Sequence, residues 1–135
     1  MDLTDSLFIS ASGMKSQGTR LRVLAENVAN ANSLAKTPDG DPYRRKIITF
    51  ENAMNDEIGV PQVNVESIEP DMGDFGRKFR PGHPAADADG YIKTPNVKPL
   101  VEMADIKEAQ RSYEANLKVI EASRQMVNGT LGLLR

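Results

Sequence analysis

The sequence predicts a mainly α-helical chain in which long N- and C-terminal helices pair as an antiparallel coiled coil, joined by a small β and irregular middle. All eight prolines lie between Pro38 and Pro99. Proline inside a helix costs about 3 kcal/mol, so long helices are expected only at the two ends. Large apolar residues also recur every seven positions in both end segments. We therefore divide the chain into an N-terminal helix at 1–33, an extended strand-and-turn middle at 34–98 and a C-terminal helix at 99–135.

The N-terminal segment carries a seven-residue repeat of large side chains. Leu7, Met14, Leu21 and Val28 are seven residues apart, and Leu24 follows Leu21 by three. A strict seven-residue period is typical of helices that supercoil around a partner helix. A column of small residues, Ala11, Gly18 and Ala25, runs beside it and is expected to let another backbone approach closely.

The helix then runs into the asparagine-rich stretch "LAENVANANS" at 24–33. One interpretation treats the amides as helix-end caps and turn formers, chiefly for Asn32 and Ser33. In the other, Asn27 and Asn30 hydrogen-bond to the backbone of the middle segment or of adjacent subunits. A buried amide of this kind fixes register, because leaving it unpaired costs about 1–3 kcal/mol.

The C-terminal segment repeats the apolar pattern more strongly. Its columns comprise Ile106, Tyr113, Ile120, Val127 and Leu134, and then Met103, Leu117 and Leu131. Two helices that each bury one stripe rarely form a stable unit alone. We therefore expect a chain that completes its core by assembly, with a monomeric helical hairpin as the alternative.

The middle segment is predicted to hold short strands and turns. The β-branched and aromatic residues of 43–50 and the alternation in 61–68 are typical of strands. "PDGDP", "RPGHP" and "DADG" have the composition of turns. The basic run at 44–46 is interpreted as a solvated strand edge.

Composition argues against several functional classes. The net charge of −2 does not favour a general nucleic-acid or anionic-membrane binder. No apolar run approaches the roughly 20 residues of a membrane span, and the N-terminus lacks the pattern of a secretory signal. With no cysteine and His83 as the single histidine, neither a zinc site nor a nucleophilic triad is expected. We expect no enzyme activity, no cofactor, no metal and no small-molecule substrate.

Three stretches resemble one family. "SLFISASGMKSQGTRLRVLAENVANANS" at 6–33 resembles the N-terminal signature of bacterial flagellar axial proteins, with its N-x-A-N box. The stretch at 102–133 is similar to their C-terminal helix and includes the core "RSYEAN", which ends at Asn116. "GHPAADADGYIKTPNV" at 82–97, and the insertion at 34–46, are similar to the segments of proximal rod proteins of the C type.

The resemblance implies a structural subunit of the flagellar basal-body rod, a hollow periplasmic drive shaft that encloses an export channel. It implies copies of itself, the other proximal and distal rod proteins, the rod-base adaptor and the inner-membrane ring as neighbours. It also implies export without a cleaved signal peptide, through the flagellar type III apparatus. The residues expected to pair the helices or contact other subunits are Leu7, Met14, Leu21, Leu24, Asn27, Val28, Asn30, Met103, Ile106, Tyr113, Asn116, Leu117, Ile120, Val127, Leu131 and Leu134.

Two other functions fit parts of the sequence. A non-flagellar coiled-coil adaptor, or a type III-secreted interaction protein, would share the apolar columns but would not need the turn-rich stretch at 82–97. A wall hydrolase would need carboxylates that converge in a cleft, and the paired acids at 87 and 89 lie instead in a turn sequence.

Overall fold

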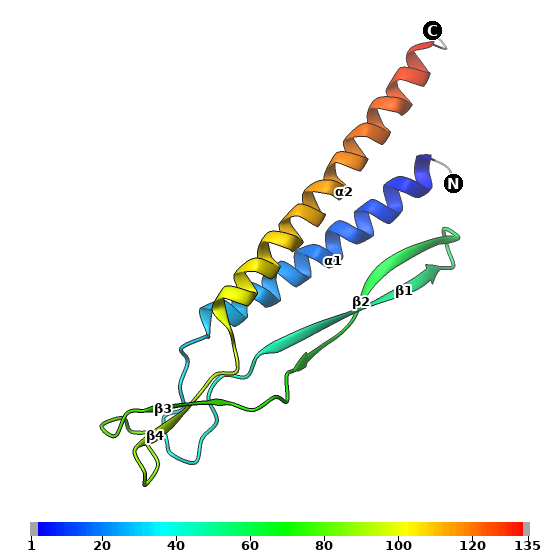
Figure 1. The fold of residues 1–135 in the computed structure, drawn as a ribbon. Helices are drawn as coiled ribbons and strands as arrows, with labels where there is room; N and C mark the ends of the chain where they lie inside the picture. The colour runs from blue at the N-terminus through cyan, green and yellow to red at the C-terminus, as the bar shows by residue number, and fades with distance from the viewer. Residues whose placement is uncertain (1–2, 134–135) are drawn as a thin grey trace. The chain divides into compact units, whose positions relative to one another are not determined.

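The computed structural model describes residues 3–133, which form two long helices separated by short strands (Figure 1). The elements in chain order are α1 (Leu3–Ala29), β1 (Lys46–Asn55), β2 (Val60–Pro70), β3 (Gly76–Phe79), β4 (Tyr91–Thr94) and α2 (Pro99–Leu133). Two two-stranded sheets are present in this part of the chain, β1 with β2 and β3 with β4. The mainly helical fold class with a small β middle is thus confirmed.

The ends of the helices follow the local chemistry of the sequence. α2 begins at Pro99, where the missing N–H of proline costs nothing in the first turn. α1 ends at Ala29, just before the last asparagines of the amide-rich stretch. Neither helix is long and apolar enough to cross a membrane within residues 3–133. Leu134, expected at a helix contact, lies outside the described residues.

The chain divides into two compact units, which we describe separately. The first unit comprises Met1–Leu21, Ile48–Ser67 and Ile106–Arg135. The second unit comprises Arg22–Ile47 and Ile68–Asp105. The boundaries fall inside α1, α2, β1 and β2, so each unit contains a part of both helices.

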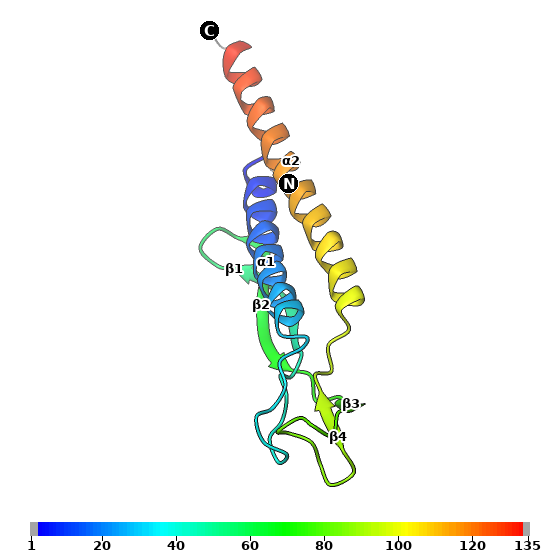
Figure 2. The same cartoon turned by 90° about the vertical axis from the view of Figure 1, so that its left-hand side faces the viewer.

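The second unit has a small apolar core and the two-stranded sheet of β3 and β4. The two strands pair antiparallel from Gly76 opposite Thr94 to Phe79 opposite Tyr91 (Figures 1 and 2). The buried apolar side chains of this unit are Val23, Leu24, Ala85, Ile92 and Val97. The sequence did not predict β3 and β4, because each strand has only four residues and no clear alternation.

The "DADG" stretch forms the turn that leads into β4. The Asp87 carboxylate accepts hydrogen bonds from the N–H groups of Tyr91 at 2.8 Å and Asp89 at 3.0 Å. These bonds, that of Tyr91 first, lower the pKa of Asp87. Gly90 takes a φ of 82°, the left-handed conformation that glycine adopts without strain. The turn chemistry expected for this stretch therefore accounts for the Asp87 carboxylate.

In the first unit, serines of α1 hold the backbone of the β1–β2 hairpin. The Ser16 hydroxyl donates to the Val63 carbonyl oxygen at 2.7 Å. The Val63 N–H donates to the Ser12 hydroxyl oxygen at 3.2 Å, and Ser12 itself donates to the Ile9 carbonyl. The helix thus supplies a hydrogen-bond partner to both backbone groups of Val63.

The Ser12 contact makes a residue-specific prediction. In Ser12→Ala the Val63 amide loses its acceptor, and a hydrogen bond of this kind contributes about 0.5–1.5 kcal/mol. Hydrogen exchange at the Val63 amide, measured by NMR, should accelerate by about two- to tenfold. Ser16→Ala is the matched control, because it removes the partner of the carbonyl and leaves the acceptor of the amide in place. Equal exchange at Val63 in Ser12→Ala and wild type would contradict the assignment.

Candidate functional site

Asn27 is the centre of a polar cluster in the second unit. Its side chain is fully buried, with 0% of its surface exposed. Its Nδ2 donates to the Lys46 carbonyl oxygen at 2.9 Å and to Glu102 Oε2 at 3.0 Å. Its Oδ1 accepts from the Lys46 N–H at 2.9 Å and from the Tyr43 hydroxyl at 2.9 Å. All four hydrogen-bonding positions of the amide are therefore used.

These contacts confirm the hypothesis that Asn27 binds the backbone of the middle segment. They also join the last turns of α1 to the start of β1 and to the first turn of α2. Asn30 behaves differently, because its Nδ2 donates to the Glu26 carbonyl of its own helix and its Oδ1 accepts from Ser33. In the described chain Asn30 is a helix-end residue, as the first interpretation of the stretch expected.

Glu102 is buried, with 1% of its surface exposed, and needs a cationic partner. Arg45 supplies it through a hydrogen bond from Nε to Glu102 Oε1, and its Nη1 also lies 3.6 Å from Asp71 Oδ2. Burial acts to lower the pKa of Arg45, but Glu102 and then Asp71 outweigh burial and raise it. The Arg45 N–H in turn donates to Asn96 Oδ1.

The interpretation of residues 44–46 as a solvated strand edge is wrong. Arg44 donates to the carbonyl oxygens of Asp71 and Gly73 and stacks on the Phe75 ring, with its Cζ 4.1 Å from the ring centroid. Arg45 binds Glu102, as described above. The Lys46 ammonium group lies 2.8 Å from Glu26 Oε2. The basic run therefore links the segments of the second unit.

The other predicted contact residues differ in exposure. Leu24 is buried with Asn27. Half-buried positions are Leu7, Met14, Leu21, Val28, Asn30, Ile106, Tyr113, Asn116 and Ile120. Exposed positions are Met103, Leu117, Val127 and Leu131. Their roles in helix pairing and subunit contact stay predictions.

Small and polar residues occupy the most buried positions of α2. Glu102, Ala109 and Ser123 are buried at intervals of seven or fourteen, and Asn116 falls between the last two. In the first unit Asn116 faces Gly13, where a Cβ would meet its Nδ2 at 2.9 Å. Sequence reasoning did not select Gly13, Glu102 or Ala109, although the seven-residue spacing of Glu102 and Ala109 was available as a signal. The column of small residues at which another backbone was expected to approach is not buried in this way, since Ala11 and Ala25 are exposed.

Several large apolar side chains of the first unit are exposed instead. On α2 they are Leu117, Val119, Met126, Val127, Leu131 and Leu133, which we call the exposed apolar face. Val119, Met126 and Leu133 are seven residues apart and so lie along one side of the helix. Residues 3–133 contain no group of three His, Cys, Asp or Glu side chains placed to hold a metal ion.

Asn27→Ala should destabilise the chain strongly. It removes the hydrogen-bond partner of the Lys46 N–H, of the Tyr43 hydroxyl and of Glu102 Oε2, which should cost about 3 kcal/mol or more. Asn27→Asp should be worse at pH 7, because it sets a second carboxylate against Glu102. Urea unfolding measures both variants. Asn30→Ala is the control and should lose about 1 kcal/mol or less; equal losses at the two positions would contradict the cluster.

The Glu26–Lys46 pair makes stability depend on pH. The Lys46 hydrogen bond lowers the pKa of Glu26 below its ordinary 4.5, and Glu26 raises the pKa of Lys46 above 10.5. Since the folded Glu26 binds its proton less readily, the pair stabilises the fold above pH 4.5 and is lost as pH falls through the lowered pKa. The stability gap between wild type and Glu26→Gln should therefore be full at pH 7 and vanish in acid. Glu69 makes no ion pair among residues 3–133, so the difference in free energy of unfolding between wild type and Glu69→Gln should not change with pH. If the difference for Glu26→Gln persists in acid, it does not come from the Glu26–Lys46 pair.

Comparisons with known proteins place the chain in a family. Residues 88–133 match the model described as flagellar basal body rod FlgEFG protein, C-terminal. The flagellar basal-body rod protein FlgC of Agrobacterium fabrum is 50% identical over 94% of this chain and 91% of its own length. FlgC of Salmonella typhimurium is 38% identical over 98% of both chains, and that of Borreliella burgdorferi is 36% identical over 100% and 99%. The chain therefore belongs to the FlgC family of flagellar basal-body rod proteins.

Proposed function

We propose that this chain is a structural subunit of the flagellar basal-body rod and that it assembles through its terminal helices with copies of itself and with other rod proteins. The exposed apolar face of α2 carries the proposal. Leu131 is 57% and Leu133 89% exposed. Exposed apolar rows of this length are typical of surfaces that a partner covers.

The helices are further proposed to pair as an antiparallel coiled coil. Support comes from two contacts in the first unit. Gly13 lies against Asn116, and Arg20 Nη1 lies 3.8 Å from Glu108 Oε1. From the first contact to the second, the chain advances seven residues along α1 and goes back eight residues along α2. This opposite progression supports an antiparallel pairing. Small side chains at these contacts favour close approach of the two backbones, which would leave the large apolar columns for neighbouring subunits.

The remaining parts of the proposal rest on the family. A rod built from such subunits would be a hollow shaft in the periplasm that transmits torque and encloses the export channel. The chain would leave the cytoplasm through the flagellar type III export apparatus without cleavage of a signal peptide. Its neighbours would then include the proximal and distal rod proteins, the rod-base adaptor and the inner-membrane ring.

Val127→Asp tests this function. Val127 is exposed, so the free energy of unfolding of the free chain should change by no more than about 0.5 kcal/mol. In the rod, however, the carboxylate would be buried in an apolar contact, and assembly should fail. Cells that carry only this variant should be non-motile and should lack complete rods in electron micrographs of basal bodies.

The control introduces the same charge on the side of α2 away from this face. Gln125 is exposed and polar, and Gln125→Glu should leave motility intact. Normal motility and complete rods in Val127→Asp would contradict a role of this face in assembly. Normal rods in cells that lack the chain altogether would overturn the proposed function itself.

A further inference from the structure

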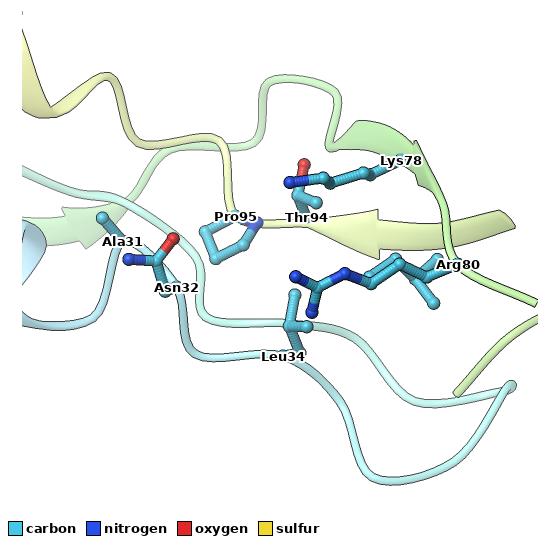
Figure 3. Close-up of a pocket in the computed structure, with 8 residues that line it drawn as sticks. Ala31, Asn32, Leu34, Lys78, Arg80, Thr94 and Pro95 are labelled. Atoms are coloured by element: carbon cyan, nitrogen blue, oxygen red, sulfur yellow. The ribbon is translucent and has the colours of Figure 1, made fainter. Parts of the chain in front are cut away.

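A small pocket in the second unit has an apolar floor and a basic rim. Its volume is ≈ 170 Å³. Ile92, Pro95 and Leu34 form the apolar part, and the side chains of Lys78 and Arg80 extend toward it from β3 and the residue that follows (Figure 3). Sites for small molecules usually measure about 300–1,000 Å³. The pocket therefore suits one apolar side chain with an acidic neighbour better than it suits a metabolite.

The two rim cations have no partner of their own. Among residues 3–133 neither Lys78 nor Arg80 makes a side-chain hydrogen bond or ion pair. Their neighbours on the same sheet are paired, since Arg77 Nη2 lies 3.1 Å from Asp87 Oδ2 and Lys93 Nζ lies 3.1 Å from Asp41 Oδ1. The sheet thus satisfies the cations outside the pocket and leaves the two at its rim available.

The β1–β2 hairpin is acidic over residues 48–67, opposite in charge to the rim of the pocket. Residues 48–67 contain Glu51, Asp56, Glu57 and Glu66 and no lysine or arginine. None of these four acids forms an ion pair with any residue from 3 to 133. At the hairpin tip Asp56 and Glu57 stand next to Ile58, which is 40% exposed.

The hairpin tip is held in one conformation. The Asn55 carbonyl oxygen accepts the N–H groups of Gly59 at 2.7 Å and Ile58 at 3.2 Å, and its side-chain oxygen accepts that of Glu57 at 3.0 Å. Gly59 adopts a φ of 68°, which closes the turn. An ordered tip loses little conformational entropy on docking.

We propose that the hairpin tip of one copy docks into the pocket of the next copy, with Ile58 on the apolar floor and Asp56 and Glu57 against Lys78 and Arg80. The contact joins two different surfaces, so it repeats from copy to copy and suits a helical assembly. It rests on the proposed rod function and names one of its subunit contacts. Charge steering would make the association fall with added salt.

Cysteine cross-linking tests the contact, because the chain contains no cysteine. A chain with both Ile58→Cys and Leu34→Cys should give a ladder of disulfide-linked multimers in isolated basal bodies. Each single variant should give none, and the two single variants expressed together should give dimers only. Ile58→Cys with Met72→Cys, exposed outside the pocket, is the control and should give no ladder.

Charge exchange tests the chemistry. Lys78→Glu with Arg80→Glu should reduce the yield of the ladder by about tenfold or more, and adding Asp56→Lys with Glu57→Lys should restore it. Lys36→Glu with Lys98→Glu makes the same change in net charge at two lysines that do not line the pocket and should have no effect.

The outcomes separate this contact from the function on which it rests. An intramolecular disulfide without multimers would mean that the hairpin docks on its own chain and would overturn the proposal. Basal bodies that contain the double-cysteine chain but yield no ladder would also overturn it, while leaving the rod function intact. Absence of the wild-type chain from basal bodies would contradict the rod function itself.

Discussion

The buried amide of Asn27 is the interaction on which the second unit depends. An amide without exposed surface must find a partner for each donor and acceptor, and here those partners come from Tyr43, Lys46 and Glu102. The end of α1, the start of β1 and the start of α2 therefore take one mutual arrangement. Glu102 in turn requires Arg45, which carries the constraint to Asp71 and Asn96. A unit with few large apolar residues in its core gains its specificity from these polar contacts.

The first unit is packed differently, with small residues in place of a buried polar cluster. Its buried positions in α1 and α2 are mostly serine and alanine, and Ser12 and Ser16 satisfy the hairpin backbone. Small residues let the backbones approach, but they bury little apolar area, so they stabilise the unit weakly. Six large apolar residues of the exposed apolar face remain accessible on α2. In the rod proposed here, the stability missing from a single chain would come from its neighbours.

The sequence predicted the helices and the hairpin strands well, because proline distribution, periodicity and β-branched residues act locally. It also identified Asn27, since an amide inside an apolar repeat demands a partner. It misjudged residues 44–46, because Asp71, the Phe75 ring and Glu102 lie 25 or more positions away and no local pattern announces them. Gly13 and Ala109 were missed for a related reason. Periodicity draws attention to large residues, whereas the closest approach of two helices selects small ones.

Both units carry charged side chains that make no ion pair, and these charges have opposite signs at the pocket and on the hairpin. Most carboxylates of the second unit sit in turns or ion pairs, and Arg77 and Lys93 are paired across short distances. Lys78 and Arg80 at one pocket, and the four acids of the hairpin, make no ion pair among residues 3–133. Solvent alone can hydrate them, yet opposite signs on two ordered surfaces also favour contact between copies. Since the pocket and the hairpin are different surfaces, the proposed contact differs from that of a symmetric dimer, and its repetition builds either a closed ring or an open helical assembly. An open helical assembly would suit the rod proposed above.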